Sequence, residues 1–195
     1  MHSSFSETTG KRHVFLLYGL GGAGKTQIAY KFVAESQARE NQRYIVFHLG
    51  MPRCVWYSYC PLRFSEIFFI NASTEATTAA SFKSIALSKG IGSTEDDTLK
   101  WLQAQKSEWL LLFNNADDET FELHKFFPSC RHGNILITSR HAEFRDYAPG
   151  ASREVSNMDV SDAQNLLLYD IQEDGPEVGK TAAEIVSVCS IMVAR

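Results

Sequence analysis

The sequence predicts an α/β fold in which a mainly parallel sheet lies between layers of helices, and three observations support this. Short apolar runs alternate along the chain with stretches whose apolar residues recur at helical spacing. The run at 109–113 is apolar throughout, as expected of a parallel strand buried on both faces. A glycine-rich segment at 19–24 joins the first apolar run to the first helical stretch. We therefore expect right-handed crossovers and a three-layer sandwich.

The composition fits one globular domain and excludes several classes of protein. Of the 195 residues, 44% are hydrophobic and 22% charged, which is too apolar for a disordered chain. The net charge of −4 disfavours a basic face for nucleic acid, so we expect no nucleic-acid partner. No apolar run approaches the roughly 20 residues that cross a bilayer, so we expect no membrane association. Residues 1–12 form a polar tail without a signal peptide, and we expect a cytoplasmic protein.

The predicted elements alternate between strands and helices along the chain. Strands are expected at 13–18, 66–71, 108–113, 134–140 and 154–158. The first helix begins near Gly24 and carries an apolar face of Ile28, Ala29, Phe32 and Val33. The next is capped by Ser73 and broken by Gly90 and Gly92, and a short helix follows around 98–102. Two further helices are expected at about 163–168 and 177–193.

Residues 19–26 carry the strongest functional signal, because they match the phosphate-loop pattern G-x-x-x-x-G-K-[ST] between a strand and a helix. Glycines allow several backbone N–H groups to converge on one anion, and the following helix adds its positive N-terminal end. Lys25 places a charge on the β- and γ-phosphates, and Thr26 offers its hydroxyl to Mg²⁺. The residues predicted to bind the nucleotide are Gly19, Gly21, Gly22, Ala23, Gly24, Lys25, Thr26 and Gln27.

The position that usually carries the metal-binding acid is occupied by an amide. Phosphate-loop enzymes hold Mg²⁺ with a carboxylate at the end of another strand, but the strand at 108–113 is followed by Asn114. Losing a charge-assisted contact costs about 1.5–3 kcal/mol, so we expect slow or absent hydrolysis. Asp117 and Asp118 follow shortly after, and two interpretations stay open. Either a water bridges one of them to the metal, or both are solvated loop acids.

Arg140 is predicted at the ligand edge of the sheet. The strand at 134–140 ends in this cation, and the carboxyl ends of parallel strands face the ligand in open α/β sheets. A guanidinium group is a planar fork suited to a γ-phosphate. We favour a sensor role over a surface arginine because Thr138 and Ser139 supply polar neighbours. The catalytic candidates are therefore Asn114, Asp117 and Arg140.

The order of these motifs resembles that of NB-ARC nucleotide-binding modules, the STAND-class P-loop NTPase switches of NLR-type signalling proteins, and is most similar to fungal versions. The resemblance is carried by residues 17–29, 68–73, 111–118 and 133–140, and it covers most of 10–37 and 63–190. It implies ADP or ATP as ligand, Mg²⁺ as cofactor and a conformational signal. It also implies partner signalling proteins or self-association into a homo-oligomer.

The chain departs from the family pattern in three places. The family has Asp where this chain has Asn114, which places metal binding and hydrolysis in doubt. Residues at about 38–62 have no counterpart, and form a surface loop, a translated non-coding segment or a partner-binding loop. The domain at 13–195 ends before the family's Gly-Leu-Pro-Leu-type motif and helical ARC subdomains. Two alternatives remain: a small P-loop phosphotransferase, whose lid arginines would be scattered here, or a degenerate fragment without activity.

Overall fold

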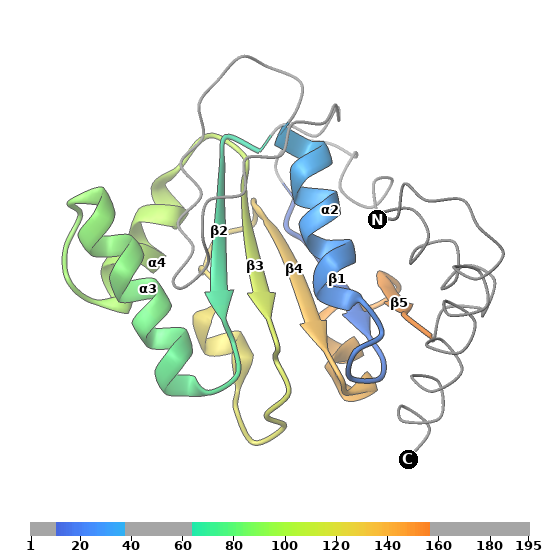
Figure 1. The fold of residues 1–195 in the computed structure, drawn as a ribbon. Helices are drawn as coiled ribbons and strands as arrows, with labels where there is room; N and C mark the ends of the chain where they lie inside the picture. Colours follow the sequence, from blue (N-terminus) through green and yellow to red (C-terminus); the bar gives the residue numbers. More distant parts are fainter. Residues whose placement is uncertain (1–10, 38–63, 157–195) are drawn as a thin grey trace, which may run out of the picture. The chain divides into compact units, whose positions relative to one another are not determined.

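The computed structural model describes residues 11–37 and 64–156, which form a parallel sheet flanked by helices (Figure 1). The elements in chain order are β1 (His13–Tyr18), α2 (Lys25–Gln37), β2 (Glu66–Asn71), α3 (Glu75–Lys89), α4 (Glu95–Ala104), β3 (Trp109–Asn114), η1 (Leu123–Phe126), β4 (Asn134–Ser139), η2 (Ala142–Tyr147) and β5 (Ser152–Glu154). The strand order is β2-β3-β4-β1-β5, and every pairing is parallel. The predicted α/β class with a mainly parallel sheet is confirmed.

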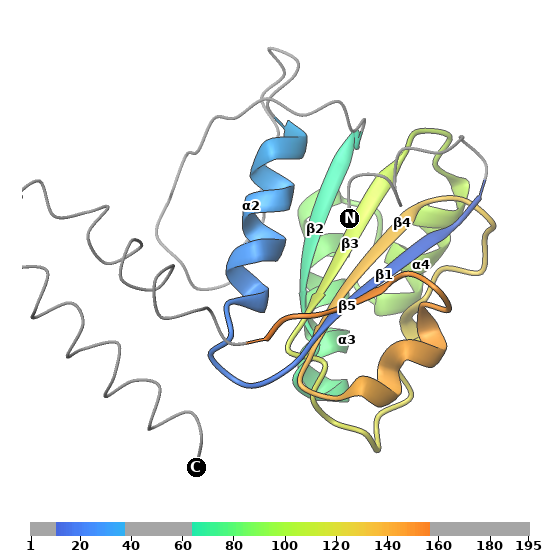
Figure 2. The same ribbon diagram turned by 90° about the vertical axis from the view of Figure 1, so that its right-hand side faces the viewer.

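Helices lie on both faces of this sheet. Helix α2 covers one face, whereas α3 and α4 lie on the other (Figures 1 and 2). Side chains alternate along β2, so that Phe68 joins Phe82 of α3 in the main apolar cluster. Phe69 points to the opposite face, where its ring meets Tyr30 of α2 edge-on at 5.4 Å between centroids. The described residues therefore form the three layers that the sequence predicts.

The central strands are buried almost completely. All six residues of β4 are buried, and so are all residues of β3 except Asn114. Trp109 begins β3 with 1% of its surface exposed, and its indole Nε1 donates a hydrogen bond to the carbonyl of Leu102 in α4. Trp109 is therefore a core residue, as expected of a strand that is buried on both faces. Asn114, the last residue of β3, is the first polar residue of this strand, and it lies at the edge of the sheet where the strand ends.

Helix α3 begins one residue later than the sequence predicts. The N-cap is Thr74 and not Ser73, because the extended backbone of Thr74 lets its hydroxyl accept a hydrogen bond from the Thr77 N–H. The Thr77 hydroxyl accepts in turn from the Thr74 N–H, which completes a capping box. At the other end, Gly90 adopts a left-handed conformation and stops the helix, as predicted.

Two further predictions are corrected. Strand β5 spans Ser152–Glu154 and not 154–158, because its register is set by pairing with β1, where Ser152 lies opposite Leu16. Ile28 was expected on the apolar face of the first helix, but it is 40% exposed, whereas the other three members of that face are buried. The insertion at 38–62 and the predicted helices at 163–168 and 177–193 lie outside the described residues. Within those residues, no helix has the length and apolar character needed to span a membrane.

Two glycines with left-handed backbones allow a matched test of this packing. A Cβ added to Gly90 (φ 66°) would meet no other atom within 4 Å. A Cβ added to Gly133 (φ 90°) would lie 2.1 Å from the Trp109 ring. We expect Gly90→Ala to lower the free energy of unfolding by about 1–2 kcal/mol. Gly133→Ala should lower it by a further 1–3 kcal/mol or so, because it also overpacks the core. Urea denaturation measures both, and equal losses would contradict the placement of Gly133 against Trp109.

Candidate functional site

The glycine-rich loop leaves the end of β1 and enters the first turn of α2. Positive φ angles occur at Gly19 (137°), Gly22 (80°) and Gly24 (88°), and side chains disfavour these conformations. Within the loop, the Ala23 N–H donates a hydrogen bond to the Leu20 carbonyl at 3.3 Å. The strand, loop and helix that the phosphate-loop pattern requires are therefore present in the expected order.

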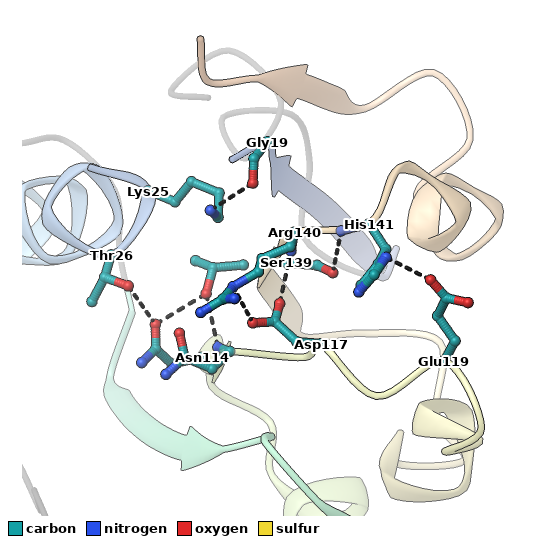
Figure 3. A network of polar contacts seen from close by, with 11 residues as sticks. Gly19, Lys25, Thr26, Asn114, Asp117, Glu119, Ser139, Arg140 and His141 are labelled. Carbon is teal, nitrogen blue, oxygen red and sulfur yellow. Dashed lines mark hydrogen bonds and ion pairs between the residues drawn. The ribbon is translucent and has the colours of Figure 1, made fainter. Parts of the chain in front are cut away.

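Lys25 is the first residue of α2 and is buried, with 9% of its surface exposed. Its Nζ donates a hydrogen bond to the Gly19 carbonyl at 2.8 Å, so the ammonium group lies back across the loop (Figure 3). Burial lowers the pKa of Lys25, the Asp117 carboxylate opposes this effect, and the Arg140 guanidinium adds to it. A desolvated cation at a helix N-terminus is well suited to bind an anion.

Asn114 lies beside the hydroxyl that the sequence assigns to Mg²⁺. It is the last residue of β3, and its Oδ1 accepts hydrogen bonds from Thr26 Oγ1 at 2.9 Å and from Thr138 Oγ1 at 3.0 Å. The Thr138 hydroxyl also accepts from the Asn115 N–H at 3.0 Å. Thr138, expected to serve as a polar neighbour of Arg140, instead holds the end of β3. Asn114 thus occupies the predicted position next to Thr26, and β3, β4 and α2 meet there.

The donor set around Thr26 fits Mg²⁺ only weakly. Magnesium prefers oxygen ligands and usually takes one or two carboxylates together with substrate phosphates. Here the described neighbours of Thr26 Oγ1 offer the neutral amide oxygen of Asn114 and, beyond it, the hydroxyl of Thr138. Because these oxygen groups are neutral, the negative charge that Mg²⁺ needs would have to come from the phosphates of a ligand.

Asp117 pairs with Arg140, a contact that sequence reasoning did not anticipate. One carboxylate oxygen accepts from the Arg140 N–H at 2.7 Å, and the other lies 3.0 Å from Arg140 Nε (Figure 3). The Asp117 side chain is 26% exposed and that of Arg140 64%. Asp118 instead accepts from the N–H and hydroxyl of Thr120, which lowers the pKa of Asp118. Asp118 therefore fits the interpretation as a loop acid, whereas the Asp117 carboxylate binds the backbone and side chain of Arg140.

A second side-chain contact joins the same two loops. His141 Nδ1 lies 2.5 Å from Glu119 Oε1, and the His141 N–H donates to Ser139 Oγ at 3.0 Å (Figure 3). Glu143 joins Glu119 and His141 in a group at the surface whose carboxylate oxygens and imidazole nitrogen all lie within 4.8 Å of one another. Sequence reasoning missed these residues because no local pattern links Glu119 to His141. Their effect is to fix the loop after β3 against the turn after β4.

Comparisons with known proteins give little further information about this site. No family model and no curated protein matches the chain. Among solved structures, the chain is similar to Cdc6p from Pyrobaculum aerophilum, with a TM-score of 0.45 and 14% identity over 82% of this chain. The match spans only 43% of that protein. Similarity at this level shows no function for this chain.

The burial of Lys25 predicts a pH-dependent contribution to stability. Its pKa is lower in the folded chain than in the unfolded chain, so the unfolded state binds more protons between the two values. The stability of the wild type relative to Lys25→Met should therefore rise as pH rises through that window. Urea denaturation at several pH values from about 7 to 10 measures this difference. Lys31→Met, an exposed position on α2, is the control and should show no such trend. A constant difference for Lys25→Met would contradict the lowered pKa.

Proposed function

We propose that the protein is an adenine-nucleotide-binding switch module of the STAND/NLR type, which holds ADP or ATP and hydrolyses ATP weakly or not at all. The observation that carries this proposal is the buried ammonium group of Lys25 at the N-terminus of α2, directly after a glycine-rich loop. The preference for adenine comes from the family resemblance of the four motifs. Conformational signalling and association with partner proteins or other copies come from the same source.

Phosphate binding follows from the chemistry at the start of α2. The first N–H groups of a helix have no intrahelical acceptor and carry the positive end of the helix dipole. The Lys25 ammonium lies at the same place, and burial, which strips it partly of water, lowers its pKa. A di- or triphosphate placed there adds negative charge beside the ammonium group. The bound phosphates then stabilise the charged form of Lys25.

Weak hydrolysis follows from the neutral side chain at position 114. Attack of water on a γ-phosphate relies on Mg²⁺ to neutralise charge in the transition state. The amide oxygen of Asn114 already accepts two hydroxyl hydrogen bonds and brings no charge toward a metal at Thr26. A nucleotide held in this way persists, as a switch requires. When bound, Mg²⁺ would supply Lewis-acid stabilisation of the phosphates beside Thr26.

The role of Lys25 is tested by Lys25→Ala. Loss of a charge-assisted contact to phosphate costs about 1.5–3 kcal/mol, so the Kd for a fluorescent ADP analogue should rise about ten- to a hundredfold. Lys31→Ala removes an exposed lysine from the same helix and should leave the Kd unchanged. Fluorescence titration measures both. Retained affinity in Lys25→Ala would exclude the phosphate-loop assignment.

The role of position 114 is tested by Asn114→Asp. A carboxylate at the end of β3 would add a charged oxygen beside Thr26, so Mg²⁺-dependent release of phosphate from ATP should increase about tenfold or more. Asn115→Asp adds the same charge one residue further on, at an exposed position with a φ of 60° that Asp tolerates. This control should not increase turnover. If Asn114→Asp has no effect either, position 114 is not the metal position.

A further inference from the structure

The geometry points to Asp117 as an internal competitor for the terminal phosphate of the nucleotide, and we infer that it sets the preference between a diphosphate and a triphosphate. This inference rests on the proposed function, because it assigns a role at the same site. Arg140, the residue suited to bind a γ-phosphate, forms an ion pair with a carboxylate of the protein itself.

The contact between the two residues uses both oxygens of the carboxylate. Asp117 accepts from the backbone N–H of Arg140 at 2.7 Å and pairs with its Nε at 3.0 Å. A carboxylate paired with Nε occupies one of the guanidinium donors that a phosphate would use and offsets the positive charge. The arginine side chain is 64% exposed, so it can exchange partners without disturbing the core.

The surroundings hold the carboxylate in place while the arginine side chain moves. The loop after β3 is fixed to β4 by the Asn115 N–H bond to Thr138 Oγ1 and by the Ala116 N–H bond to the Thr138 carbonyl, each within 3.0 Å. The Glu119–His141 pair adds a second connection between the same loops. The backbone contact between Asp117 and Arg140 therefore persists when the guanidinium group leaves.

The charges make this exchange selective for the number of phosphates. Asp117 and Arg140 both influence the pKa of Lys25, so the pair lies within electrostatic reach of the ammonium group that binds the phosphates. A γ-phosphate competes with Asp117 for Arg140. A diphosphate lacks that group and leaves the pair intact. Asp117 therefore weakens the binding of triphosphate relative to diphosphate.

The test compares ADP with a non-hydrolysable ATP analogue by isothermal titration calorimetry. Asp117→Asn keeps the shape of the side chain and an acceptor for the Arg140 N–H but removes the charge. It should improve analogue affinity relative to ADP about two- to fivefold, the range expected of a partly exposed ion pair. Asp118→Asn, which removes a neighbouring charge bonded only to its own loop, should leave the ratio unchanged.

Competition for Arg140 is distinguished from simple repulsion by repeating the comparison in an Arg140→Ala background. Competition predicts that the effect of Asp117→Asn on the ratio shrinks there, and an equal effect would overturn the inference. An unchanged affinity ratio in Asp117→Asn itself would also overturn the inference.

If Asp117→Asn does not fold, Arg140→Ala alone must weaken the binding of the ATP analogue more than the binding of ADP. An equal loss for both ligands overturns the inference. If the wild type binds neither nucleotide, the proposed function fails as well. If the wild type binds both nucleotides, the proposed nucleotide binding holds and the variants test only the role of Asp117.

Discussion

The site is organised around one buried positive charge. Lys25 loses hydration where α2 begins, and its ammonium group donates a hydrogen bond to the Gly19 carbonyl. Burial lowers the pKa of Lys25, the Asp117 carboxylate opposes this effect, and the Arg140 guanidinium adds to it. A desolvated cation at a helix N-terminus favours the binding of an anion.

The parallel sheet explains why distant residues meet there. The carboxyl ends of parallel strands share one edge, so β1, β3 and β4 deliver Gly19, Asn114 and Arg140 to the same side. Strand β3 is apolar from Trp109 to Phe113 and β4 from Ile135 to Ile137, so the polar residues that end these strands lie at that edge. Polar hydrogen bonds then connect the strand ends, with Thr138 binding both Asn114 and the backbone of Asn115.

Local patterns were sufficient to predict β1 and β2 to the residue and the helix stop at Gly90. Each depends on alternation, a special backbone conformation or a motif of fixed spacing. The Thr74 cap was missed because Ser73 and Thr74 are both good capping residues, and backbone geometry decides between them. The position of β5 and the Asp117–Arg140 pair depend on partners far along the chain. Neither carries a local sequence signal.

Under the proposed function, the neutral amide at position 114 and the buried ammonium group together imply that a bound nucleotide would be held mainly by the charge on its phosphates and would depend little on a metal. The most direct measurement is calorimetric titration of the wild-type protein with ADP, once with Mg²⁺ and once with a chelator. The account predicts saturable one-to-one binding in both conditions, with similar affinity. Absence of saturable binding in both, or binding only with Mg²⁺, would contradict it.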